Sequence, residues 1–119
     1  DATARAVVLR GAGGHFCAGL DLAEVAASPG EQEARNRAVG ARYLAISELP
    51  QVVIAAVEGA AHAGGLGFVC CADIALCSND ARFAAPEVRR GLVPAQILPW
   101  MVRRMGRAQA TRMALEGGV

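Results

Sequence analysis

The chain has 119 residues, of which 54% are hydrophobic and 19% charged, as is typical of one soluble globular domain and not of a disordered chain. Its net charge of +1 gives no reason to expect nucleic acid or an anionic membrane as a partner, and it has no apolar run of about 18 residues to span a membrane. The four cysteines lack a C-x-x-C pair or a zinc spacing, so we expect a cytoplasmic protein without a metal site.

The first half of the chain predicts two strands and a helix. Residues 5–10 are a short β-branched run that leads into a glycine turn, as in a buried strand. A dinucleotide-binding fold can begin in this way, but the G-x-G-x-x-G pattern fails at Phe16, which excludes a nicotinamide or flavin cofactor. Residues 31–49 predict a helix that Pro50 ends, and residues 52–57 predict the second buried strand.

The second half predicts further strands and helices in alternation. After a glycine-rich loop at 59–67 we expect a helix at about 66–71, strands at 74–77 and 82–84, and helices at about 95–105 and 108–116. Cys70 and Cys71 stand in an apolar run and are expected to be buried. Strands separated by helices indicate an α/β fold.

Two glycine-rich loops each follow a predicted strand, at 16–22 and 63–67. Small residues allow backbone N–H groups to point into a cavity, and two such groups that converge on one oxygen form an oxyanion hole. One loop of this kind would be weak evidence, because most glycine loops are only turns.

Five motifs stand in a fixed order along the chain: FCAGLDL at 16–22, EGA with AGG at 58–65, ADIA at 72–75, RFAAPE at 82–87 and GLVP at 91–94. In order and spacing, from Ala6 to about Glu116, they resemble the crotonase (enoyl-CoA hydratase/isomerase) superfamily. The resemblance implies a crotonase-like superhelix of repeated β-β-α units that assembles as a homotrimer or hexamer. Family members are longer, so residues 1–119 would be the central part of the domain, without its N-terminal strand region and its C-terminal helical region.

The resemblance also implies the ligand and the site. The family binds acyl-CoA thioesters, with coenzyme A as part of the substrate and no other cofactor. The oxyanion-hole N–H groups would belong to Leu20 and Gly64, and the acid/base would be Glu87. Further substrate contacts would come from the two loops and the segment before Glu87, at Ala18, Asp21, Leu22, Gly65, Gly67 and Pro86.

One position departs from the hydratase pattern of the family. That pattern has a first glutamate three residues after Gly64, where this chain has Gly67. A mechanism with two carboxylates therefore does not transfer, and we expect Gly67→Glu to favour water addition only if the cavity can hold the longer side chain.

Three functions stay open at this stage. The segment 86–96 resembles bacterial hydratases of the methylglutaconyl type, which makes an enoyl-CoA hydratase the leading hypothesis. An enoyl-CoA isomerase needs only one carboxylate and is the alternative. A non-catalytic protein that keeps the fold is the third.

Other chemically active residues are predicted to be structural. We expect Asp73 to stabilise the fold, His62 to be packed or to face solvent, and Cys17 not to act as a nucleophile. A solvated helix face is the favoured interpretation of an arginine cluster, and a phosphate-contacting patch is the alternative. The cluster comprises Arg103, Arg104, Arg107 and Arg112.

Overall fold

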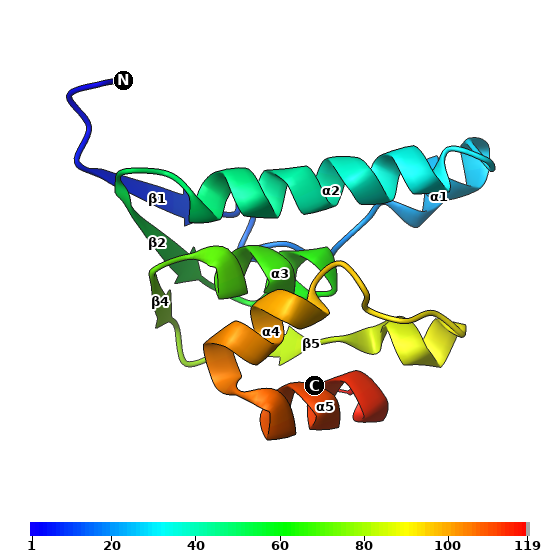
Figure 1. Ribbon diagram of the computed structural model, residues 1–119. Helices are drawn as coiled ribbons and strands as arrows, with labels where there is room; N and C mark the ends of the chain where they lie inside the picture. Colours follow the sequence, from blue (N-terminus) through cyan, green and yellow to red (C-terminus); the bar gives the residue numbers. More distant parts are fainter. Residues whose placement is uncertain (119) are drawn as a thin grey trace.

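Each strand of the chain joins one of two small parallel sheets (Figure 1). The computed structural model describes residues 1–118, without the side chains of Leu22 and Glu24. The first sheet has the order β1-β2-β4, and the second pairs β3 with β5. The elements are β1 Ala6–Arg10, α1 Leu22–Ala27, α2 Gln32–Ser47, β2 Val52–Val57, β3 Ala60–His62, α3 Gly64–Cys71, β4 Ile74–Cys77, β5 Arg82–Ala84, the 3-10 helix η1 Pro86–Arg90, α4 Leu98–Met105 and α5 Arg107–Glu116.

The order of the elements repeats a β-β-α unit. β2 enters the first sheet, β3 enters the second, and α3 follows; β4, β5 and η1 repeat this course. The segment after β1 follows a similar course, because Cys17 joins the second sheet through an isolated parallel bridge with Ala61 of β3. The structure therefore has the predicted architecture of repeated β-β-α units.

α3 separates two clusters of buried side chains. On one side, Val53, Ala55 and Val57 of β2 pack with Val69 of α3. On the other side, α3 packs against α2 and α4, and α4 packs against α5, around a second cluster of buried residues: Tyr43, Leu66, Cys70, Cys71, Ala85, Ile97, Met101 and Ala110. Cys70 and Cys71 are buried and free, as predicted.

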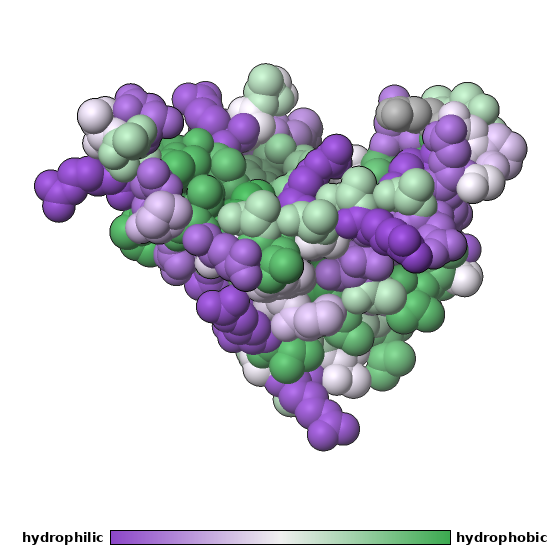
Figure 2. Space-filling model, turned by 45° about the horizontal axis from the view of Figure 1, so that its top comes forward, coloured by the Kyte–Doolittle hydropathy of each residue, from purple (hydrophilic) through white to green (hydrophobic). Residues whose placement is uncertain are grey.

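The opposite face of the first sheet is open to solvent. Val8 is 57% exposed, Ile74 45% and Leu76 60%. Figure 2 shows hydrophobic residues at the surface of the end that carries this sheet. Parallel sheets are usually covered on both faces, which is why their strands are apolar throughout. β2 has such a continuous apolar run, but the described elements cover only one of its two faces.

Some boundaries differ from the predictions. β3 lies within the stretch predicted as a loop. It was not predicted, because a strand of three residues is too short to show an alternating pattern. α3 begins at Gly64, two residues earlier than predicted. α4 begins at Leu98 and not near 95. Pro99 lies in the first turn of the helix, where no N–H is needed. Before the helix, the N–H of Ala95 donates to the carbonyl of Val93 in a turn.

Asp73 ties two strands of the first sheet together, as expected of a structural residue. Its Oδ2 accepts a hydrogen bond of 2.8 Å from the N–H of Val53, and its own N–H donates to the carbonyl of Val53 at 2.9 Å. Nearby, the guanidinium of Arg104 donates to the carbonyls of Ala72 and Asp73. This arginine of the cluster therefore binds the end of α3, which supports the structural interpretation over a phosphate patch.

Asp73→Ala should lower the free energy of unfolding by about 1 kcal/mol, because the Val53 N–H loses its side-chain acceptor. Denaturant unfolding of the protein that carries this chain measures the effect. Glu33→Ala is the control, since Glu33 makes only an exposed ion pair with Arg37 on α2. Equal stability of the Asp73 variant and the parent would contradict the structural role.

Candidate active site

Backbone hydrogen bonds join the two glycine-rich loops. The N–H groups of Phe16 and Cys17 donate to the carbonyl of Ala60 at 3.1 and 2.9 Å, and the N–H of His62 donates to the carbonyl of Cys17 at 2.9 Å. The first loop thus runs alongside β3 and reaches the start of α3. Gly65 packs so closely on Cys17 that a β-carbon there would collide with the Cys17 carbonyl.

The two predicted oxyanion donors lie on adjoining backbone. Gly19, which precedes Leu20, has a φ of +100°, and a β-carbon built on it would lie 3.7 Å from the nitrogen of Gly64. Gly64 is the first residue of α3, where the N–H groups have no acceptor within the helix. No backbone acceptor is found among the described residues for the N–H of Leu20 or of Gly64. The two loops therefore meet at Gly19 and Gly64, and the N–H groups of Leu20 and Gly64 have no backbone acceptor there.

The backbone is strained immediately before Gly64. Ala63 has φ 53° and ψ −119°, the one positive φ outside glycine among residues 1–118. Its N–H donates to the carbonyl of Ala84 in β5 at 2.9 Å, which anchors this turn. Strain of this kind costs about 1–3 kcal/mol and is concentrated at functional sites. Here it redirects the chain from β3 into α3 and sets the orientation of the Gly64 N–H.

Glu87 is held in η1 by the local sequence. Pro86 begins this short helix, and Gly91 ends it in the left-handed region with a φ of 70°. The N–H of Leu92 donates to the carbonyl of Glu87 at 3.0 Å. The backbone of Glu87 is therefore fixed on both sides.

The carboxyl group of Glu87 is partly buried and has an unused oxygen. Its Oε2 is buried and has no hydrogen-bond partner among the described residues. Burial raises the pKa of this carboxyl above the usual glutamate value, while its own backbone N–H and the charge of Arg90 act in the opposite direction. A buried carboxyl with a raised pKa and a free oxygen is suited to accept and return a proton.

Gly67 lies in the second turn of α3 against Tyr43 and Ile97. A β-carbon built there would be 2.5 Å from Cζ of Tyr43 and 2.6 Å from Cγ2 of Ile97. The structure has no room for a side chain at this position, so Gly67→Glu is not expected to supply a second carboxylate. The sequence places Tyr43 in the predicted helix at 31–49 but contains no signal for its contact with α3, which depends on packing between distant segments.

The other predicted contact residues are spread along the two loops. Ala18 and Asp21 are exposed, and Pro86 is half-buried. Asp21 Oδ1 accepts a hydrogen bond of 2.9 Å from the N–H of Ala23 and so caps α1. Leu22 begins α1, and its side chain lies outside the described part of the structure. His62 is half-buried, and its Nε2 has no partner among the described residues.

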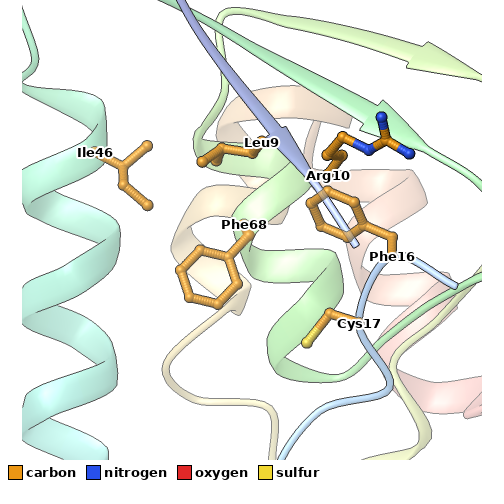
Figure 3. Close-up of a pocket in the computed structure, with 6 residues that line it drawn as sticks. All are labelled: Leu9, Arg10, Phe16, Cys17, Ile46 and Phe68. Carbon is orange, nitrogen blue, oxygen red and sulfur yellow. The ribbon is translucent and has the colours of Figure 1, made fainter. Parts of the chain in front are cut away.

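A cavity of about 260 Å³ adjoins the first loop (Figure 3). Figure 3 shows Cys17 of the loop, Ile46 of α2 and Phe68 of α3 around it. Neither Glu87 nor Gly64 is among its lining residues. The cavity therefore adjoins the candidate site at Cys17 and is not the site itself.

The side chains of the described region do not gather into a metal site. Within residues 1–118, no group of three or more His, Cys, Asp or Glu side chains is placed to hold an ion. No helix in the same region is long and apolar enough to cross a membrane.

Comparisons with known sequences agree on one family. A family model described as enoyl-CoA hydratase/isomerase matches residues 1–119. The chain is 37% identical over 116 residues to the bacillaene synthase dehydratase PksH of Bacillus subtilis (strain 168), covering 95% of this chain and 45% of that protein. It is also 37% identical over 120 residues to the probable enoyl-CoA hydratase EchA14 of Mycobacterium tuberculosis (strain ATCC 25618 / H37Rv), covering 100% of this chain and 47% of that protein.

Solved structures resemble this one closely. Pseudomonas aeruginosa AtuE has a TM-score of 0.89 and 46% identity, over 96% of this chain and 46% of that one. An enoyl-CoA hydratase from Mycobacterium smegmatis has a TM-score of 0.91 and 38% identity, over 98% and 46% of the two chains. The chain spans about half the length of the curated relatives it matches. The superpositions confirm the predicted α/β superhelix.

Gly67→Ala should destabilise the protein by about 1–3 kcal/mol, because the added methyl group collides with Tyr43 and Ile97 in a packed core. Gly40→Ala in α2 is the matched control. There the methyl group would meet only the flexible end of Gln96, and alanine is the better helix former. Equal unfolding midpoints for the two variants would contradict the packing at Gly67.

The raised pKa of Glu87 predicts a pH-dependent stability. Between the ordinary glutamate pKa and the raised one, the folded state binds more protons than the unfolded state, so stability falls as pH rises through this window. Glu87→Gln should not show this loss, and its stability relative to the parent should increase with pH. Unfolding curves from about pH 4 to about pH 8 measure the difference. A difference that is constant with pH would contradict the assignment.

Proposed function

Because the chain belongs to the enoyl-CoA hydratase/isomerase family, we propose that the protein that carries it adds water reversibly to the double bond of a 2-enoyl-CoA thioester. The observation that carries the proposal is the arrangement of the site. Two adjoining backbone donors, at Leu20 and Gly64, have no backbone acceptor among the described residues. Glu87, in η1 of the next β-β-α unit, has a buried oxygen without a hydrogen-bond partner among them.

The two N–H groups stabilise the enolate. Addition of a nucleophile at C3 of the thioester moves negative charge onto the carbonyl oxygen, where fixed donors are worth several kcal/mol. Both donors are backbone groups on a rigid frame, because the pairing of Cys17 with β3 and the start of α3 fix them. The acyl-CoA would lie along the first loop, past Ala18, Asp21 and Leu22, and would reach Pro86. Gly65 and Gly67 are buried against Cys17 and Tyr43, so the contacts that the resemblance implies for them are not part of this path.

Glu87 acts as the acid and the base in turn. As a carboxylate it takes a proton from water while the oxygen forms a bond to C3. As a carboxylic acid it then gives a proton to C2 as the enolate collapses, which returns Glu87 to its starting state. Its raised pKa lowers the energy needed to hold the proton between the two steps.

Isomerisation is the second candidate, and the packing at Gly67 favours it. Tyr43 and Ile97 fill the space beside Gly67, so no second carboxylate is available from this position to hold water. A single carboxylate can instead take a proton from C2 of a 3-enoyl thioester and return it at C4. Hydration remains the leading proposal, because one relative is named a dehydratase and another a probable enoyl-CoA hydratase, and dehydration is the reverse of hydration.

The remaining proposals concern the setting of the reaction. We expect no cofactor beyond the coenzyme A of the substrate, no nucleic-acid partner, a cytoplasmic location and a homotrimer or hexamer. A non-catalytic protein on the same fold is the third possibility. Turnover of any enoyl-CoA in a panel of chain lengths, with water addition and double-bond migration followed separately, would exclude it.

Glu87→Gln should reduce turnover by more than tenfold and leave acyl-CoA binding nearly unchanged. Glutamine keeps the shape of the side chain but cannot exchange a proton at neutral pH. Steady-state rates with crotonyl-CoA and the dissociation constant of a saturated acyl-CoA measure the two effects.

Glu58→Gln, at an exposed glutamate before the second loop, is the control and should keep the parent rate. If Glu87→Gln retained more than about a tenth of the rate, a change in barrier under about 1.4 kcal/mol, Glu87 would not be the principal acid/base.

A further inference from the structure

Tyr43 contacts the start of α3 at several points. The residue is fully buried, and its hydroxyl donates a hydrogen bond of 2.8 Å to the carbonyl of Gly64. Its ring packs edge-on against Phe68, with the ring centroids 4.9 Å apart. The same ring packs directly against Gly67: a β-carbon built on this glycine would lie 2.6 Å from the hydroxyl oxygen of Tyr43. One side chain therefore touches Gly64, Gly67 and Phe68, which lie on successive turns of α3.

The hydrogen bond completes the support of Gly64. The peptide unit before Gly64 is set by the strained backbone of Ala63, whose N–H is anchored on Ala84. The peptide unit after Gly64 carries the carbonyl that Tyr43 binds. Since peptide units are planar, fixing both units fixes the residue between them and the direction of its N–H.

The Tyr43 hydroxyl keeps its proton over the working pH range. Burial raises its pKa well above the usual tyrosine value, and the neighbouring Cys71, Cys17 and Glu87 raise it further. The group is therefore a permanent hydrogen-bond donor and does not act as a proton carrier. The charge of Glu87 lies within electrostatic reach of the hydroxyl.

We propose that Tyr43 is a positioning residue of this site: its hydroxyl fixes the Gly64 end of the oxyanion hole, and its ring closes the space beside Gly67 to a second acidic side chain. The inference rests on the proposed function and extends it to a residue of α2 that lies outside both glycine loops. Tyr43 acts through the geometry of Gly64, so it should affect the stabilisation of the enolate more than the binding of the substrate.

Tyr43→Phe tests the hydroxyl. The ring and its packing remain, but the Gly64 carbonyl loses its donor. We expect kcat with crotonyl-CoA to fall by about tenfold while KM changes by less than about twofold. Ser47→Ala is the matched control: Ser47 lies on the same helix and donates to the carbonyl of Leu44 at 2.8 Å, but this hydrogen bond is exposed. A parent-like kcat for Tyr43→Phe would overturn the role of the hydroxyl.

A double-mutant cycle tests the ring and does not depend on activity. Gly67→Ala should lower the unfolding midpoint less in a Tyr43→Leu background than in the parent, because leucine leaves more room beside position 67. An equal loss in both backgrounds would overturn the space-filling role. If Tyr43→Leu does not fold, the effect of Gly67→Ala is compared between the Tyr43→Phe background and the parent. A Gly67→Ala variant with the stability of the parent would overturn the space-filling role by itself.

Comparing the turnover of Glu87→Gln with that of Tyr43→Phe distinguishes a failure of the positioning role from a failure of the proposed function. If Glu87→Gln abolishes turnover and Tyr43→Phe does not change it, only the positioning role of Tyr43 fails. If neither substitution changes turnover of crotonyl-CoA or of 3-hexenoyl-CoA, the proposed function itself fails. Loss of kcat in both variants, with KM preserved in Tyr43→Phe, supports both.

Discussion

The pairing of Cys17 with Ala61 is the contact on which the site depends. It lies between a loop after β1 and the strand that follows β2, two segments far apart in the sequence. Without it, Leu20 and Gly64 would have no reason to lie near each other, since Gly64 has no side chain with which to make the connection. The geometry of the candidate site is thus produced by backbone hydrogen bonds, which explains how these loops can be held together with so few polar side chains.

Close backbone packing requires small residues, and the composition reflects this need. Gly65 lies against Cys17, Gly19 against Ala63, and Gly67 against Tyr43, each with no room for a further carbon without movement of a neighbour. A larger residue at Gly19 or Gly65 would push the two loops apart, and one at Gly67 would push α3 away from α2. The abundance of glycine is therefore a structural requirement of the site and not a sign of a flexible chain.

Much of the fold could be predicted from local patterns, but the site could be predicted only through the family resemblance. The strand at 52–57 and the helix at 31–49 have long apolar or helix-forming runs; β2 has the predicted bounds, and α2 is shorter at both ends, from Gln32 to Ser47. β3 is too short to leave a periodic signal. The role of Tyr43 depends on a contact with a residue far along the chain, and spacing within a helix contains no information on it. The roles of Leu20, Gly64 and Glu87 stay predictions that fit the geometry.

The parallel order of the first sheet has a consequence for the rate of folding. β1 can pair with β2 only after the chain has closed a loop that contains both α1 and α2, and β2 must wait in the same way for β4. Such non-local pairing makes folding slow, because the entropy of closure is lost before the contacts form. During this delay the apolar strands remain unpaired, and the uncovered face of Val8, Ile74 and Leu76 stays open even after they pair. The unpaired apolar strands are therefore most exposed to self-association before the sheet is complete.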